Sequence, residues 1–162
     1  MTDQVLAKDR RTIAVSKERA QYDHEVLDIA RVVRVVKGGR RFRFRASVLV
    51  GNRNGKVGFG VGKSRDVQSA IQKAQAQAEK SLITIVLDGA TIAHEVFARY
   101  KGAQLKLRPA QPGTGVIAGN VVRAVAELAG VKDLVSKAFG SSNKINNVKA
   151  ALLAFQNVSK KK

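Results

Sequence analysis

The sequence predicts an α+β protein made of two small domains, and the order of its segments carries this prediction. A strand with a period of two, a hairpin signal and an amphipathic helix follow one another in the first half. After Asp88-Gly89, strand-like and helix-like segments follow again. With 162 residues, 44% of them apolar, the chain is long enough for two such units. We expect domains at 25–89 and 90–158, a mobile arm at 1–24 and a basic tail at 159–162.

The clearest strand lies at 41–50, after a β-branched stretch at 29–36 that predicts an extended segment and a turn at Gly38-Gly39. Apolar side chains at Phe42, Phe44, Ala46, Val48 and Val50 alternate in this strand with Arg41, Arg43, Arg45, Ser47 and Leu49. We expect the apolar set to face the core, Phe42 and Phe44 included, although exposed aromatics could also stack on bases. The other face carries three arginines, at Arg41, Arg43 and Arg45.

A hairpin and a helix follow this strand. Asn54-Gly55 is typical of a two-residue type I′ turn and predicts a return strand at 56–61. An amphipathic pattern then predicts a helix that ends near Lys80, with Ser64 as its N-cap and Asp66 in its first turn.

Strand signals continue across the expected domain boundary. An apolar, β-branched stretch at 82–87 predicts the last strand of the first domain. Segments 95–100 and 104–107 predict a hairpin that turns near Lys101-Gly102, and both prolines of the chain fall in a loop at 109–115.

Two helices are predicted near the end of the chain. The first runs from about Ala118 and stops at Gly130, and the stretch 131–138 fits either a strand or a helix. Ser141-Ser142-Asn143 provides capping residues for the last helix. Its expected inward side chains are Ile145, Val148, Leu152 and Phe155.

Charge is the strongest functional signal. The chain has 30 Lys and Arg against 12 Asp and Glu, a net charge of +18. No acid occurs between Asp28 and Asp66, whereas 11 of the cations do. Such clustering is typical of a surface that binds a polyanion rather than of a merely solvated surface.

The glycine-rich run at 58–64 resembles a phosphate-binding loop only in part. A Walker A loop needs a glycine where Val57 stands, and a dinucleotide fingerprint needs its third glycine at Lys63. The run fits part of a strand better than a loop of free N–H groups. Its glycines, with Lys63 and a helix N-terminus, could still suit a nucleic-acid phosphate.

Other classes of function find little support. We expect no enzyme, because paired carboxylates and nucleophile motifs are missing from the sequence. Cysteine is absent and only His24 and His94 supply imidazole, so neither a metal site nor a cofactor is expected. The first residues do not resemble a signal peptide and no apolar run could span a bilayer, so we expect a soluble, cytoplasmic protein. A basic protein that binds DNA or a membrane surface stays open on these grounds.

Several stretches resemble one protein family. They are Val36–Phe42, Asn54–Lys63 and Ala70–Ala74 in the first half, and Pro112–Gly119, Arg123–Val125, Glu127–Val131 and Gly140-Ser141 before Asn143 in the second. With these stretches in the family's order, the chain resembles the bacterial small-subunit ribosomal protein number five. The resemblance implies an N-terminal domain similar to a double-stranded-RNA-binding domain, a sheet plus a helix. A small C-terminal α+β domain with a βαβ core would follow it.

The resemblance also implies a function. Members of this family are structural constituents of the small ribosomal subunit that bind its rRNA, support its assembly and contribute to decoding accuracy near the mRNA entrance. The implied partners are therefore small-subunit rRNA, the neighbouring small-subunit proteins four and eight, and mRNA, in the cytoplasmic ribosome. No membrane partner is implied.

Two groups of residues are expected to make these contacts. The RNA-binding group is Lys37, Gly38, Gly39, Arg40, Arg41, Arg43, Arg45, Arg53, Lys56 and Lys63. Its glycines would let the backbone approach phosphates, while its arginines offer bidentate contacts. The candidates for protein contact are Pro112, Gly113, Thr114 and Gly115. Lys144 departs from the Asn-Pro common in the family, which should add charge and loosen the final turn.

Overall fold

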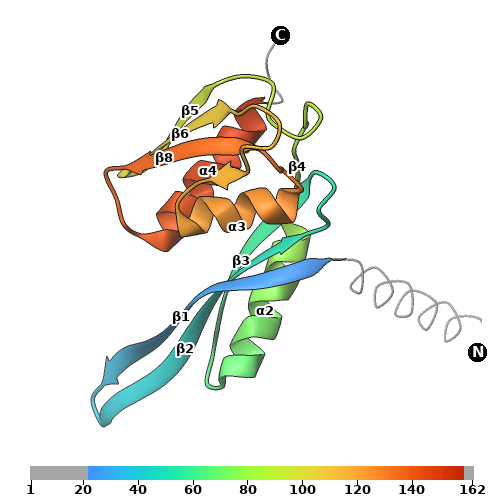
Figure 1. The fold of residues 1–162 in the computed structure, drawn as a ribbon. Helices are drawn as coiled ribbons and strands as arrows, with labels where there is room; N and C mark the ends of the chain where they lie inside the picture. The colour runs from blue at the N-terminus through green and yellow to red at the C-terminus, as the bar shows by residue number, and fades with distance from the viewer. Residues whose placement is uncertain (1–21, 159–162) are drawn as a thin grey trace, which may run out of the picture.

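The computed structural model describes residues 22–158, which form two α+β domains (Figure 1). The first domain contains β1 (Asp23–Val36), β2 (Gly39–Gly51), β3 (Lys56–Ser64), α2 (Val67–Lys80) and β4 (Ile83–Thr84). The second contains β5 (Val96–Tyr100), β6 (Ala103–Pro109), β7 (Val116–Ile117), α3 (Asn120–Ala129), β8 (Leu134–Phe139) and α4 (Lys144–Val158). The predicted fold class is confirmed.

Each domain contains one four-stranded sheet. The first sheet is antiparallel, in the order β1-β2-β3-β4. The second has the order β5-β6-β8-β7, and β7 and β8 are parallel strands connected through α3. This βαβ unit is the core that the family resemblance implied for the second domain.

The two predicted termini fall largely outside the described residues. This holds for the tail at 159–162 and for the arm up to residue 21. Asp23 and His24, which the prediction placed in the arm, begin β1 and pair with Gly51 and Val50 of β2.

Helix α2 packs so closely on the first sheet that its backbone contacts the backbone of β3. Three glycines alternate along β3, and three alanines recur every fourth residue along α2. A Cβ on any of these glycines would collide with the carbonyl oxygen of the alanine that it faces. The facing pairs are Gly58 with Ala78, Gly60 with Ala74 and Gly62 with Ala70. The glycine-rich run is therefore a strand that allows close helix packing, and its backbone pairs with β2 instead of forming a phosphate loop.

The start of α2 corrects the predicted cap. Ser64 still belongs to β3, where it pairs with Phe44. Asp66 is the N-cap, and its Oδ2 accepts a hydrogen bond from the Ser69 N–H at 3.1 Å. Because an acidic side chain already occupies this helix N-terminus, the suggestion that it holds a phosphate loses its basis. The predicted end near Lys80 is confirmed.

Strand β2 is buried on both faces along its second half. Its residues facing α2 are buried as predicted, namely Ala46, Val48 and Val50. Leu49, expected on the arginine side, is fully buried as well because the second domain covers that face. Phe42 was expected in the core and is instead 44% exposed, whereas Phe44 is half-buried against the cluster under α2. Helix α2 does not cover the outer end of the β1–β2 hairpin (Figure 1), and Phe42 is not part of the cluster packed under this helix, so alternation alone could not bury it.

The turn between β2 and β3 is longer than predicted. Arg53 and Gly55 have positive φ angles of 53° and 80°, while Asn54 does not, so the two-residue type I′ turn is wrong. The side chain of Asn52 organises the turn, since its Oδ1 accepts hydrogen bonds from the N–H groups of Asn54 and Lys56 at 2.8 and 3.0 Å. The hairpin itself is confirmed.

This turn joins the first domain to the C-terminal end of α3. The Arg53 N–H donates to the Leu128 carbonyl and the Gly55 N–H donates to the Ala129 carbonyl, both at 2.9 Å. The last carbonyls of a helix have no partner inside it, so the turn satisfies two of them. Gly130 ends the helix as predicted, with a φ of 86°, and a Cβ on it would collide with the Arg53 carbonyl.

The chain between the domains contains less strand than predicted. Of the expected strand at 82–87, only Ile83–Thr84 pairs with β3. Ile85 then donates its N–H to the Gly55 carbonyl at 2.7 Å and buries its side chain in the main core. Because the Ile85 N–H bonds to this turn, the pairing of β4 with β3 ends at Thr84.

The second domain follows the prediction more closely. Its first hairpin turns at Lys101-Gly102, and the ambiguous stretch 131–138 contains strand β8 from Leu134 onward. Helices α3 and α4 lie on one face of the sheet (Figure 1). The expected inward residues of α4 are confirmed: Val148 and Phe155 are fully buried, and Ile145 and Leu152 pack partly buried against the core.

The packing of β3 on α2 leads to a test by substitution. Gly60→Ala should lower the free energy of unfolding by about 3 kcal/mol, because its Cβ would meet the Ala74 carbonyl and lie 2.6 Å from the Ala78 nitrogen. Denaturant unfolding followed by circular dichroism measures this change. Gly38→Ala is the matched control, since nothing lies within 4 Å of its Cβ position. Equal stability of the two variants would contradict the proposed close contact.

Candidate nucleic-acid interface

A long hairpin formed by β1 and β2 extends beyond the helix-covered part of the first sheet (Figure 1). We call residues 31–43 the projecting hairpin. After a register shift between Val26 and Asp28, the two strands pair without interruption from Asp28 and Ser47 up to Val36 and Gly39. Most side chains here are exposed, up to 74% for Val35, because neither α2 nor the second domain covers them. An exposed ribbon of this kind can be contacted from both sides.

One side of the projecting hairpin is rich in arginine. Directly paired residues of antiparallel strands point to the same face, and Arg34 pairs with Arg41. Arg43 and Arg45 follow at the next two alternate positions of β2, on the same face. We call these four residues the arginine face. No acid within the described residues pairs with Arg34, Arg41 or Arg43, so these three cations are available for an anion.

Arg45 differs from the other three because it takes part in an ion-pair network between the domains. It lies 3.5 Å from Asp28 of β1, which also accepts a hydrogen bond from Lys144 of α4 at 2.9 Å. The hydrogen bond from Lys144 holds the pKa of the Asp28 carboxyl below its usual range. Lys144, which replaces a common family residue, thus adds a bond across the domain junction. Arg45 is half-buried, so it stabilises the junction between the domains as well as adding positive charge to the surface.

The opposite side of the projecting hairpin combines apolar and cationic groups. Val33 pairs with Phe42, and the Arg31 guanidinium lies 3.8 Å from the centroid of the Phe42 ring. Arg40 pairs with the exposed Val35 on the same face. Stacking on the ring orients Arg31 and leaves its N–H donors open to an acceptor.

The end of the projecting hairpin has an open backbone. Lys37 and Gly38 form the turn, and Gly39 has a φ of 134°, a conformation that disfavours side chains. Nothing lies within 4 Å of the Cβ positions of Gly38 and Gly39. A phosphate group could therefore approach this backbone closely, between the cations Lys37 and Arg40.

The structure separates the predicted RNA-binding residues into groups. Lys37 to Arg43 lie together on the projecting hairpin, and Lys63 lies beside Arg45 on the neighbouring strand. Arg53 and Lys56 lie at the other end of β2, which has 13 residues and is about 40 Å long. They cannot belong to one compact contact with the end of the hairpin.

Two cations of this surface were missing from the predicted group. Arg31 and Arg34 were counted in the basic stretch but not as site residues. The strand register was the missing signal: a turn at Lys37-Gly38 places Arg34 opposite Arg41, which doubles the charge at that position.

The candidate protein-contact residues form an exposed loop before β7. Pro112, Gly113 and Thr114 are exposed, and the Thr114 hydroxyl donates to the Gln111 carbonyl at 2.7 Å. The buried carboxylate of Asp133 accepts a hydrogen bond from the Gly115 N–H at 2.8 Å. The base of this loop is therefore fixed while its outer part stays accessible.

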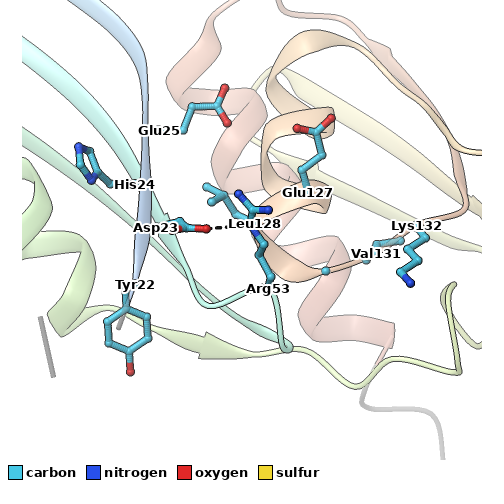
Figure 2. Close-up of a pocket in the computed structure, with 10 residues that line it drawn as sticks. Tyr22, Asp23, His24, Glu25, Arg53, Glu127, Leu128, Val131 and Lys132 are labelled. Atoms are coloured by element: carbon cyan, nitrogen blue, oxygen red, sulfur yellow. Dashed lines mark ion pairs between the residues drawn. The ribbon is translucent and has the colours of Figure 1, made fainter. Parts of the chain in front are cut away.

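A cleft of about 770 Å³ lies at the domain junction (Figure 2). Arg53 pairs there with Asp23 at 2.7 Å. The carboxylates of Glu25 on β1 and Glu127 on α3 extend into the same space from the two domains. Burial raises the pKa of the Glu25 carboxyl, and the negative charge of Glu127 raises it further.

The raised pKa of Glu25 predicts a pH-dependent effect on stability. The folded state disfavours the charged carboxylate, so Glu25→Gln should raise the free energy of unfolding at neutral pH by up to about 1 kcal/mol. The advantage should shrink as the pH falls through the raised pKa and vanish below the ordinary carboxyl value, about 4.3. Urea unfolding of both proteins across this range measures it.

Glu127→Gln serves as the companion variant. It removes only the second of the two causes and should stabilise the protein by less than Glu25→Gln. A pH-independent difference between wild type and Glu25→Gln would contradict this origin of the effect.

The fold and the projecting hairpin define a two-domain α+β protein with a strongly basic, exposed ribbon, which is the kind of surface that suits a polyanion such as nucleic acid. Comparison with known proteins specifies the family. Residues 22–86 match the family described as ribosomal protein S5, N-terminal domain, and residues 98–162 match ribosomal protein S5, C-terminal domain. The small ribosomal subunit protein uS5 of Campylobacter jejuni subsp. jejuni serotype O:23/36 (strain 81-176) is 48% identical over 136 residues. These cover 84% of this chain and 92% of that protein.

The chain belongs to the ribosomal protein S5 family. It is accordingly a structural, rRNA-binding component of the small ribosomal subunit and not an enzyme, as the sequence predicted. Among residues 22–158, no helix combines the length and the apolar character needed to cross a membrane.

Proposed function

We propose that the projecting hairpin is the principal rRNA contact of this chain. Lys37, Arg40 and the arginine face would neutralise phosphates and release their counterions. The observation that carries this proposal is the position of these cations. Apart from the half-buried Arg45, they gather on a ribbon that neither α2 nor the second domain covers, in a stretch without a single acid between Asp28 and Asp66.

Shape and backbone contacts would dominate over base reading in this interface. The cations lie along both faces and the end of one ribbon, and the open backbone at Gly38-Gly39 permits close approach. Recognition of double-stranded RNA commonly relies on phosphates and sugars in this way. A hairpin with these properties would hold rRNA helices in a fixed relative position.

The second domain supplies the protein contacts in this proposal. Its candidate loop, residues 112–115, is exposed at the edge of the second sheet. By resemblance to the family, its neighbours would be small-subunit proteins four and eight, near the mRNA entrance. The two domains would then lock rRNA and these neighbours together, which would support assembly and affect decoding accuracy in the cytoplasmic ribosome.

Removing two cations from the hairpin tests the RNA contact. Arg40→Ala combined with Arg41→Ala should reduce the salt dependence of binding to rRNA fragments by up to about two phosphate contacts. The measurement is the slope of the logarithm of affinity against the logarithm of salt concentration. Lys56→Ala combined with Lys80→Ala removes the same charge at the far end of the domain and should change the slope less. An unchanged slope for the hairpin variant would remove this loop from the interface.

A second experiment tests the role in the assembled subunit. In a cell lysate separated on a sucrose gradient at low magnesium, the protein should migrate with the small subunit and lose that position after ribonuclease treatment. The hairpin variant should enter the small-subunit fraction less efficiently than the wild type. Normal incorporation of the variant would assign the essential contacts to another surface.

A further inference from the structure

The outer face of the second sheet combines aromatic and basic side chains that the proposed hairpin contact does not use. Helices α3 and α4 cover the other face, which carries the core residues. On the outer face, alternate residues of β5, β6 and β8 point away from the helices. We call the following six residues the sheet platform: Phe97, Arg99, Lys106, Arg108, Lys137 and Phe139.

The strand register brings rings and cations together on this platform. Phe97 pairs with Lys106, which pairs in turn with Lys137, so one row across three strands holds a ring and two cations. In the neighbouring row Arg99 and Phe139 flank Gln104. Phe97 and Phe139 are 57% and 46% exposed. The two rings therefore present aromatic surface to solvent in neighbouring rows of the same face.

Glu95 is the acid at the border of the platform and organises two of its cations. It pairs with Lys106 at 2.6 Å and with Arg108 at 2.9 Å. The hydrogen bond from Lys106 lowers the pKa of the Glu95 carboxyl, so this acid stays charged. Arg99 is also held in place, because its Nε donates to the Lys101 carbonyl at 3.2 Å. The cations are therefore oriented, and they outnumber the acid.

We propose that the sheet platform binds unpaired RNA, with Phe97 and Phe139 stacking on bases and Lys106, Lys137 and Arg99 holding phosphates. Single-stranded nucleic acid is commonly bound by aromatic side chains within a basic groove or sheet. Strands β5 and β8 lie about 10 Å apart with β6 between them, which separates the two rings enough to receive different bases. This site is independent of the projecting hairpin.

The arrangement of charge favours RNA over a protein partner. The core of a protein–protein interface is depleted in lysine, and charged groups lie mainly at its rim. On the platform, Lys106 and Lys137 lie in the same row as Phe97, in the middle of the face. A polyanion with exposed bases complements this pattern.

The test measures binding of the full chain to an unstructured oligouridylate of about ten nucleotides by fluorescence anisotropy. Phe97→Ala combined with Phe139→Ala should weaken binding by about tenfold or more at unchanged net charge. Both side chains are exposed, so the thermal unfolding midpoint should change little. Arg40→Ala combined with Arg41→Ala should have a smaller effect on this probe, which separates the platform from the hairpin contact.

Conservative variants distinguish stacking from simple apolar contact. Replacement of both rings by tyrosine should retain affinity, whereas replacement by leucine should lose nearly as much as alanine. Retention by the leucine variant would overturn the proposal, because an apolar protein contact would then suffice. Leu153→Ala, at an exposed position of α4 away from the platform, is the matched control and should bind like the wild type.

A second readout places the platform in the assembled subunit. A photoreactive phenylalanine analogue at position 97 or 139 should cross-link to rRNA after incorporation into small subunits. Cross-links to a protein, or none at all, would overturn the proposal for the ribosome.

Discussion

The structure depends on the backbone hydrogen bonds between the β2–β3 turn and the end of α3. Arg53 and Gly55 donate to carbonyls that the helix cannot satisfy by itself, and Gly130 lets the two backbones meet. The contact also allows Leu49 and its neighbours to be buried from the second domain's side. Two α+β units that could have been linked loosely instead share one core, and Asp28 with Lys144 adds a further connection at its edge.

A shared core determines how the molecule presents its surfaces. The arginine face belongs to the same side of the first sheet that α3 covers further along, so the position of the second domain leaves only the outer part of that side open. The candidate loop at 112–115 and the outer face of the second sheet are fixed relative to the hairpin by the same contact. A component that holds several partners in one geometry gains from this rigidity, since little entropy is lost when the second partner binds.

Local sequence patterns predicted most elements, and the misses have a common cause. Period-two and helical spacing located the β2–β3 and β5–β6 hairpins and helices α2, α3 and α4, because those patterns reflect one buried face. Leu49 and Phe42 were assigned to the wrong environments because their burial depends on whether a distant helix covers them. The basic group was recognised from charge alone, yet its division between Lys37 and Arg53 depends on strand length and register. The ring and cation rows of the second sheet could not be predicted from the sequence for the same reason, since paired residues such as Lys106 and Lys137 are 31 positions apart.

The cover that α3 provides for the first sheet has a consequence during synthesis. Leu49, Val57 and Phe59 form an apolar surface as soon as β2 and β3 pair, but the helix that buries them begins only at Asn120. At translation rates of about 5–20 residues per second, this surface waits several seconds for its partner. The nascent chain therefore exposes this hydrophobic face of the sheet until α3 has been made, and an isolated N-terminal fragment would leave it exposed.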